Sequence, residues 1–405
     1  CKTPMAKSIT KRTLMGFRKG RTNTRYFEDL INKVQNQTDL FIEKVSNPHE
    51  YNPKNPNTMI KFNAVVGNPP YQITVAQKET ENGQKRVSSI FHWFQIVSEK
   101  IGKYTCLIYP GARWIHRSGK GLADFGLKNI NDCKLKKLYF YPNANEIFAD
   151  AGISDGITIV LKDIDKKVPG FEYLYKNYGN TQHIVMDNPG EDLMALNPMD
   201  TIIVKKIRNK VKMNNFSFLC KSILSQKLFG IESDFVEKNP SIVREYNEGE
   251  IINFETEIKL FTNDKAGKSG RSRWYIVNRN VIQTGLEFLD DWKVVVSSAN
   301  AGGQKRSNQL AILDNYSAFG RSRVALKTFK TESEANNFYK YCQSELIRFA
   351  FLMTDESLTS LAKVVPDILD YTDSNMYLDF SKDINPQLYD MFNKVRIIVH
   401  DADYR

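Results

Sequence analysis

The stretch Phe62-Asn63-Ala64-Val65-Val66-Gly67-Asn68-Pro69-Pro70-Tyr71 decides the fold of this chain. Its first six residues form an apolar run of strand length, and the run ends at an asparagine and two prolines, which stop a strand. Open α/β sheets keep their ligand crevices at the carboxyl ends of buried strands. We therefore expect residues 62–67 to form a buried strand, and residues 68–71 to lie in a loop at a binding site.

The loop has a composition that suits an amino group as its ligand. Successive prolines make it stiff, because each fixes φ at about −65° and removes a backbone N–H. The side-chain oxygen of Asn68 and the carbonyl oxygen of Pro69 can then accept hydrogen bonds from an exocyclic –NH2, and Tyr71 can stack on a planar base. These bonds draw the nitrogen lone pair out of conjugation. The same residues also suit a plain strand-ending turn in which Tyr71 covers an apolar edge.

The run from Val66 to Gln72 resembles the catalytic motif of amino-group methyltransferases that use S-adenosylmethionine, above all the N6-adenine DNA methyltransferases of type II restriction-modification enzymes. The similarity extends through residues 104–148, and residues 225–231 and 291–294 resemble the specificity half of such enzymes. The resemblance implies methyl transfer to an adenine flipped out of double-stranded DNA. The catalytic residues that it implies are Asn68, Pro69, Pro70 and Tyr71.

Two aromatic residues are candidates for the pocket of the flipped base. Phe148 lies in the connection before a predicted strand, where the resembled family often supplies an aromatic wall. Trp114 follows the carboxyl end of another predicted strand. Each also suits a packing role in the core.

The cofactor-binding signature of the resembled family is not evident in this chain. That signature is a glycine-rich turn well upstream of the catalytic motif, but only 67 residues precede Asn68, and no apolar strand leads into Gly16 or Gly20. Many relatives also carry Asp where Asn63 stands. The cofactor-binding residues are therefore unknown, and we expect this polypeptide alone to bind S-adenosylmethionine weakly or not at all. Because the chain begins at Cys1, we also expect a fragment of a bifunctional enzyme, with an upstream or separate nuclease or methylase part as partner.

The predicted elements after residue 62 alternate between strand and helix. Helices are expected at 87–101 and 122–131, and further strands at 104–109, 135–141 and 156–161. This order is half of a Rossmann-like methyltransferase sheet in an α/β fold. Glycine and proline punctuate residues 169–198. We therefore predict a catalytic subdomain at 1–170, a linker at 171–199, and a mixed α+β target-recognition domain at 200–405.

The net charge of +11 indicates a polyanionic partner, which we expect to be double-stranded DNA. In the predicted target-recognition domain, glycine-containing loops bring cations near the duplex, and arginine can bond guanine in a bidentate manner. Phosphate contacts and plain surface charge remain open for each cation. The candidates are Lys227, Arg271, Arg273, Lys305, Arg306, Arg321 and Arg323.

Other features exclude several classes of protein. The chain has no uninterrupted apolar run of about 18 residues and no signal-peptide pattern, so we expect a soluble cytoplasmic protein without a membrane partner. Its five cysteines and five histidines form no metal-binding or disulfide pattern, so we expect no metal. Two alternatives to a DNA methyltransferase remain: an enzyme that methylates ribosomal RNA or a protein glutamine, and a DNA-binding specificity module without activity of its own.

Overall fold

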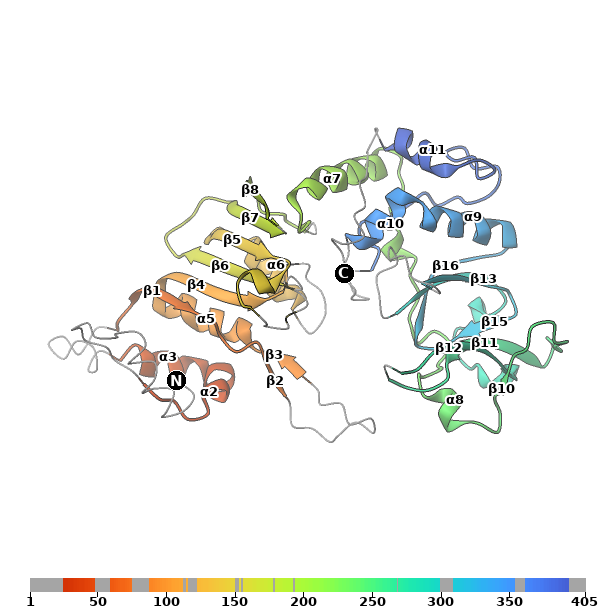
Figure 1. Ribbon diagram of the computed structural model, residues 1–405, viewed down its shortest axis with the longest axis horizontal. Helices are drawn as coiled ribbons and strands as arrows, with labels where there is room; N and C mark the ends of the chain where they lie inside the picture. Colours follow the sequence, from red (N-terminus) through yellow and green to blue (C-terminus); the bar gives the residue numbers. More distant parts are fainter. Residues whose placement is uncertain are drawn as a thin grey trace. The chain divides into compact units, whose positions relative to one another are not determined.

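The computed structural model divides the chain into two compact units, and the division falls between Leu196 and Asn197 (Figure 1). The model describes residues 25–47, 59–74, 87–111, 114–115, 122–149, 153, 156–177, 179–191, 194–267, 269–298, 309–353 and 361–392.

A six-stranded sheet organises the first unit. Its strand order is β1 (Phe62–Gly67), β4 (Gly102–Pro110), β6 (Ile157–Asp163), β5 (Leu135–Tyr141), β7 (Phe171–Asn177) and β8 (Asn180–Met186). Strand β1 is parallel to β4, and β6 is antiparallel to both β4 and β5. The carboxyl ends of β1, β4 and β5 therefore share one edge of the sheet with the amino end of β6. A short hairpin, β2 (Gln72–Thr74) and β3 (Val87–Ser89), follows β1.

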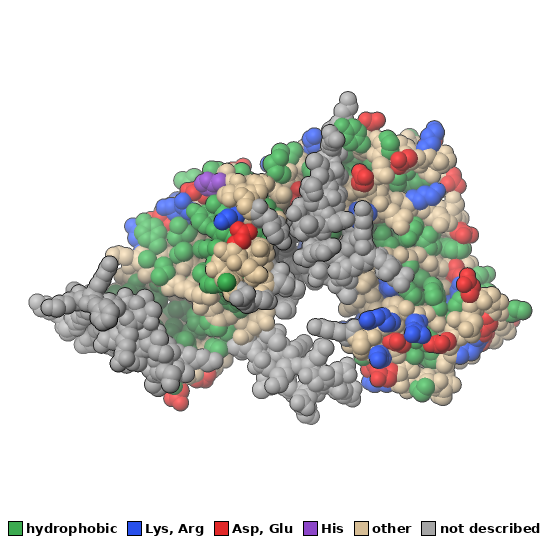
Figure 2. Space-filling view, viewed as in Figure 1, with side chains coloured by type: hydrophobic (Ala, Val, Ile, Leu, Met, Phe, Trp, Pro, Cys, Tyr) green, Lys and Arg blue, Asp and Glu red, His purple; other side chains and the backbone are tan. Residues whose placement is uncertain are grey.

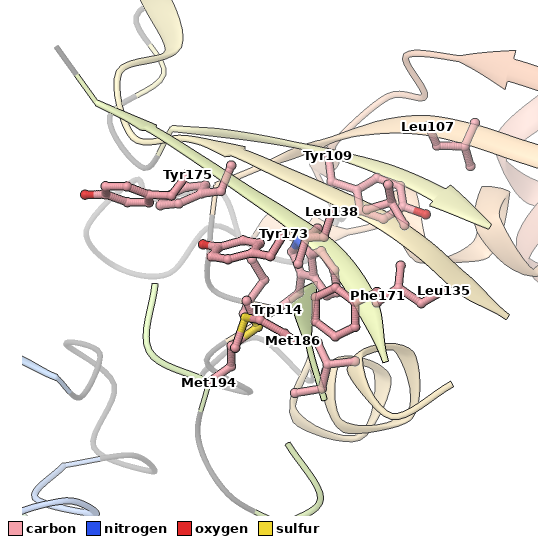
Figure 3. Packing of buried hydrophobic residues seen from close by; sticks show 14 of the residues in the cluster. Leu107, Tyr109, Trp114, Leu135, Leu138, Phe171, Tyr173, Tyr175, Met186 and Met194 are labelled. Atoms are coloured by element: carbon pink, nitrogen blue, oxygen red, sulfur yellow. The ribbon is translucent and has the colours of Figure 1, made fainter. Parts of the chain in front are cut away.

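Helices α5 (Phe91–Ile101) and α6 (Ala123–Ile130) pack on one face of the sheet (Figure 1). Side chains alternate between the two faces of a strand, and in β4 the alternate residues Thr105, Leu107 and Tyr109 are buried. Leu107 and Tyr109 belong to the aromatic-rich core shown in Figure 3. The helices are α2 (Leu30–Asn36), α3 (Thr38–Val45), α5 (Phe91–Ile101) and α6 (Ala123–Ile130), and a short 3-10 turn, η1 (Ala144–Glu146), follows β5.

Strand β1 differs from the expectation of a buried strand. It lies at the edge of the sheet among the described strands, four of its six residues are exposed, and the Val66 side chain is 73% exposed. An apolar run predicts burial only if the strand has neighbours on both sides, and here β4 is the neighbour that the structure describes.

The predicted linker at 171–199 is also corrected. Residues 171–186 form the β7–β8 hairpin, which belongs to the sheet. Gly170 and Gly179 adopt φ angles of 86° and 81°, so these glycines turn the chain within the sheet and do not separate domains. The predicted helix at 87–101 begins later than expected, because residues 87–89 form β3.

The described residues of the second unit form three further sheets and a set of helices, so the chain is a mixed α/β protein, as expected. A four-stranded sheet has the order β10 (Arg244–Glu245), β12 (Ser272–Asn278), β11 (Glu257–Asn263), β15 (Ser317–Phe319). A three-stranded sheet has the order β14 (Leu310–Leu313), β13 (Trp292–Ser297), β16 (Arg323–Phe329), and β9 (Ser217–Phe218) pairs with β17 (Pro366–Asp367). The helices are α7 (Pro198–Met213), η2 (Leu219–Lys221), α8 (Phe235–Lys238), η3 (Arg279–Val281), η4 (Leu286–Phe288), α9 (Glu332–Gln343), α10 (Glu345–Leu352) and α11 (Ile384–Met391).

Within the described part of the chain, every helix is too short or too polar to cross a bilayer.

Candidate active site

Asn68 lies at the carboxyl edge of the six-stranded sheet. Gly67, the last residue of β1, is in register with Leu107, and β4 continues beyond this point to Pro110. Asn68 and Pro70 are exposed, whereas Pro69 is buried. The buried ring anchors the turn, and the Asn68 side chain is left open to a ligand.

Tyr71 is held by the backbone of the residues that follow the motif. The amide of Ile90 donates a 3.1 Å hydrogen bond to the Tyr71 carbonyl oxygen, and Gln72 pairs with Ser89 in the β2–β3 hairpin. The Tyr71 side chain is half-buried. Burial raises the pKa of its phenol, and the nearby Asn68 side chain opposes the rise, although the two groups do not align as a hydrogen bond. The ring is therefore a neutral, partly accessible aromatic surface.

The role of Ile90 and Ser89 in holding Tyr71 was not predicted, because backbone hydrogen bonds leave no residue-type signal. His92, which follows in the first turn of α5, was also missed. Its ring centroid lies 5.6 Å from that of Phe125, burial lowers its pKa, and its Nδ1 is buried without a hydrogen-bond partner among the described residues. His92 is therefore a neutral side chain close in sequence to the residue that anchors Tyr71.

Trp114 does not line an open crevice. Its side chain is 0% exposed, and its indole Nε1 donates a 2.9 Å hydrogen bond to Thr158 Oγ1 on β6. Its ring packs edge-on against Tyr109, with centroids 5.7 Å apart. Figure 3 shows Trp114 within the core. The sequence placed this residue after a strand but could not show that its side chain turns inward, so its assignment to the base pocket is corrected.

Phe148 lies in the connection between β5 and β6, at the same edge of the sheet as Asn68. Its amide donates a 2.9 Å hydrogen bond to the Ala144 carbonyl oxygen in η1, and its side chain is half-buried. Three strand spacings, about 14 Å, separate β1 from β5 at this edge. Phe148 therefore shares an edge of the sheet with Asn68 and stays a candidate for the base pocket.

A glycine junction fixes this edge of the sheet. The amide of Gly111 donates a 2.7 Å hydrogen bond to the Gly156 carbonyl oxygen, joining the end of β4 to the start of β6. Gly156 has a φ angle of 76°, and a Cβ atom there would lie 2.4 Å from the Tyr141 carbonyl oxygen. Only glycine fits this close approach, which sets the path of the connection that carries Phe148.

The described residues do not fit S-adenosylmethionine at this edge. Nucleotide-type cofactors bind where a strand passes through a glycine-rich turn into a helix amino terminus. Strand β1 instead leads into Asn68 and two prolines, and the next described helix begins only after the β2–β3 hairpin. Among the described residues, no cluster of histidine, cysteine or acidic side chains could hold a metal ion.

In the second unit, the structure brings three of the predicted DNA-binding cations to one end of the four-stranded sheet. Arg273 pairs with Thr262 across β12 and β11, and Gly320, which precedes Arg321, donates a hydrogen bond to the Phe261 carbonyl oxygen. Lys227 lies with them because Lys227 and Arg321 both form an ion pair with Glu232. Figure 2 shows Lys and Arg side chains gathered beside Asp and Glu on this unit.

Each of these cations has an acidic neighbour. Arg321 Nη1 lies 2.7 Å and Lys227 Nζ lies 3.3 Å from the Glu232 carboxylate. These contacts, the Arg321 hydrogen bond first, lower the pKa of Glu232. Arg273 lies 3.3 Å from Glu245.

The other cations that were predicted to bind DNA differ in their exposure. Arg271 is exposed, and its amide donates a 2.8 Å hydrogen bond to Asp264. Arg323 is 4% exposed, its guanidinium lies 4.6 Å from the Phe261 ring centroid, and burial lowers its pKa to about 10. It is a core residue and does not face a duplex. Lys305 and Arg306 lie outside the described residues.

Several solved structures resemble the chain at low identity. The type IIL restriction-modification enzyme MmeI in complex with DNA shares 10% identity, with a TM-score of 0.40, over 91% of this chain and 51% of that one. A nuclease-deletion mutant of the type ISP enzyme LlaGI, in complex with a DNA substrate mimic, shares 11% identity, with a TM-score of 0.41, over 87% of this chain and 38% of that one. The type I EcoKI M protein shares 11% identity, with a TM-score of 0.28, over 44% of this chain and 34% of that one.

These likenesses are too weak to support a conclusion about this chain, which spans about a third to a half of the length of the three proteins. No curated protein sequence matches it. Residues 1–148, however, match the family model of the Eco57I restriction-modification methylase. The matched residues include both Asn68 and Phe148.

Proposed function

We propose that this chain carries the amine-binding corner of an N6-adenine DNA methyltransferase of a restriction-modification system. The observation that supports the proposal most is the position of the motif: Asn68 is exposed at the carboxyl edge of the sheet, directly after β1, and Tyr71 is anchored beside it through Ile90. The family match of residues 1–148 supports a methylase of this class.

The corner recognises the amine of a flipped adenine by its acceptors. Asn68 Oδ1 and the Pro69 carbonyl oxygen accept the two N–H groups, and the buried Pro69 ring keeps both acceptors in place. Tyr71 stacks on the base from the position that the Ile90 hydrogen bond gives it. Fixed acceptors that orient the amine lower the entropic part of the barrier and free its lone pair.

S-adenosylmethionine supplies a methyl group when it is bound. Because the described residues at the carboxyl edge of the sheet do not fit this donor, the part of this chain in the proposal is to hold and orient the amine. The second unit holds the duplex, with Lys227, Arg273 and Arg321 at one end of its four-stranded sheet as contacts to DNA. Phosphate contacts of this kind position the protein, and base contacts give it sequence preference.

The test is the replacement of Asn68 by alanine in the protein expressed from its native locus. Loss of one preorganised polar contact to a reacting group costs about 100-fold to 1,000-fold in rate. We expect that loss in transfer of labelled methyl to duplex DNA, with DNA affinity nearly unchanged. Asn63→Ala is the matched control, because Asn63 is an exposed asparagine on β1, the strand that precedes the motif.

Comparable turnover by Asn68→Ala and the wild-type protein would remove the assigned role. Labelled methyl on ribosomal RNA or on a protein glutamine, with none on duplex DNA, would show that the substrate is wrong. Binding to DNA by a wild-type protein that transfers no methyl group to any of the three would identify a specificity module.

A further inference from the structure

Helix α7 carries a dense group of cations that are not among the DNA-binding candidates named above. Between Asp200 and Glu232 the chain has seven lysine or arginine residues and no acidic residue. Five of the seven lie in α7, within eight residues of sequence. We call these five side chains the α7 cations; they are Lys205, Lys206, Arg208, Lys210 and Lys212.

The packing of α7 leaves its lysines outside the core of the second unit. Val204, Ile207 and Val211 are buried, and their spacing of three and four residues places them on one face of the helix. The helix lies against β9 and β17. Lys205 and Lys212 lie outside the buried face and are exposed, so both can meet a partner in solution.

Three of the α7 cations lack an acidic partner among the described residues. Lys205, Lys210 and Lys212 form no ion pair within the part of the chain that the structure describes. The cations at one end of the four-stranded sheet differ in this respect, since Glu232 or Glu245 lies within 3.3 Å of each of them. A phosphate that approaches the three lysines of α7 therefore displaces no described carboxylate.

The helix dipole accounts for only part of this group. Lys210 and Lys212 lie in the last turn of α7, where a cation stabilises the free carbonyl groups of the helix end. That effect is confined to the last turn, and Lys205 lies about two turns from the end of the helix. A role in capping the helix therefore leaves Lys205 unexplained.

We propose that the α7 cations bind the phosphate backbone of double-stranded DNA. The inference rests on the proposed function for the choice of DNA as the partner, and it adds a binding surface to that function. The rise of the helix separates Lys205 from Lys212 by about 10.5 Å, which is about three base steps along one strand of a duplex. Lysine contacts phosphate as a point charge without a fixed geometry, so flexible side chains at this spacing suit neighbouring phosphates.

An anionic lipid surface fits α7 less well than DNA does. A helix that lies on a membrane inserts its apolar face among the lipids, but the apolar face of α7 is buried in the protein. Met199, Ile202 and Met213 are exposed. The positions between Ile202 and Met213 on the same side of the helix are Lys206 and Asn209, so the exposed apolar residues form no continuous stripe.

The experiment measures duplex binding by the full chain after Lys205, Lys210 and Lys212 are replaced together by glutamine. Fluorescence anisotropy with a labelled DNA duplex of random sequence gives the affinity at several salt concentrations. Each phosphate contact contributes about 0.9 to the slope of log affinity against log salt, so we expect the slope to fall by about 2.7. The affinities of the variant and the wild-type protein should converge as salt approaches about 1 M, because counterion release contributes little there.

Matched variants separate a phosphate contact from net charge and from folding. Arginine at the same three positions keeps the charges and should preserve the slope. Lys44→Gln, Lys100→Gln and Lys128→Gln together make the same charge change at exposed lysines on helices of the first unit, and should change the slope little. Lys205→Gln alone leaves the last turn of α7 intact, and should reduce the slope by about 0.9 with an unchanged midpoint of urea unfolding.

An equal fall in slope for the α7 glutamine variant and the first-unit control would overturn the inference, and so would loss of binding in the arginine variant. Binding to phosphatidylserine vesicles that depends on the α7 lysines, with an unchanged DNA slope, would overturn it in favour of a membrane. If the α7 glutamine variant methylates DNA and binds it as the wild-type protein does, this inference is wrong and the proposed function stands. Binding to DNA through α7 in a protein that transfers no methyl group gives the reverse result.

Discussion

Lys293 is fully buried in β13, and its proton links the stability of the second unit to pH. Its Nζ donates hydrogen bonds to the carbonyl oxygens of Leu289, at 2.8 Å, and Asp291, at 2.7 Å. Burial lowers the pKa of Lys293 from 10.5 to about 7, and the Asp291 carboxylate opposes this change. The neutral amine satisfies both carbonyl groups, so the fold accommodates the deprotonated form.

We expect the free energy of unfolding to rise between pH 7 and about pH 10. In this range the unfolded chain keeps the Lys293 proton and the folded chain releases it, so unfolding takes up a proton. The slope is at most about 1.4 kcal/mol per pH unit, and below pH 7 this contribution is constant. Lys293→Met removes the titrating group and is expected to flatten the slope in urea unfolding followed by tryptophan fluorescence.

Lys205→Met is the control for Lys293→Met, because it makes the same substitution at an exposed lysine of α7 in the second unit and should leave the slope unchanged. Parallel pH profiles for the wild-type protein and Lys293→Met would show that the amine stays protonated in the fold.

The sequence singles out individual residues where the signal is local. Asn68 and Tyr71 are proposed as site residues because strand, proline and aromatic residue follow one another within a few positions. Trp114 and Arg323 were assigned to binding surfaces and are buried, because a sequence position near a strand does not tell which way the side chain turns. That direction depends on partners far away in the chain, such as Thr158 for Trp114 and Phe261 for Arg323.

Among the connecting elements, the junction at Gly156 offers a direct test of how the site is held. Gly156 and Gly179 have similar left-handed backbones, with φ angles of 76° and 81°. A Cβ atom at 156 would lie 2.4 Å from a backbone oxygen, whereas nothing lies within 4 Å at 179. Both Gly→Ala variants therefore incur backbone strain of about 1 kcal/mol, and only Gly156→Ala adds a clash.

We expect Gly156→Ala to destabilise the first unit by at least about 2 kcal/mol more than Gly179→Ala does, as measured by urea unfolding. The clash must move the β5–β6 connection, so Gly156→Ala should also reduce methyl transfer if Phe148 contributes to the base pocket. Equal destabilisation by the two variants would mean that the connection adjusts without cost and does not fix the edge of the sheet.

For strands with a clear apolar run, the predicted ends lie within about two residues of the observed ends, and the predicted ends of β5 are the observed ones. The hairpin of β7 and β8 was taken for a linker, because its glycines are the same residues that mark a domain boundary. Strand β1 was expected to be buried and lies at an edge. An apolar strand is buried when it has a neighbouring strand on each side. Among the described residues, β1 has a neighbour on one side, which is β4.

For the molecule as a whole, the net charge of +11 predicts attraction to DNA but not where the DNA binds. The cations gathered at one end of the four-stranded sheet are partly neutralised by their neighbours, since Glu232 contacts both Arg321 and Lys227. A phosphate that binds there must compete with this carboxylate. A bound phosphate would replace the Glu232 carboxylate as the partner of these cations. A change at Glu232 is therefore a sensitive test of the proposed DNA contact.

We expect Glu232→Gln to bind a short DNA duplex more tightly than the wild-type protein, by up to about fivefold at low salt. An exposed ion pair is worth at most about 1 kcal/mol, and its removal leaves both cations available to phosphate. Lys227→Gln and Arg321→Gln should instead weaken binding, and each should reduce the slope of log affinity against log salt by about 0.9. Fluorescence anisotropy at several salt concentrations measures both quantities.

Glu248→Gln makes the same charge change at an exposed carboxylate and is the control. If Glu232→Gln affects affinity no more than this control, the two cations serve the fold of the second unit and DNA binds elsewhere.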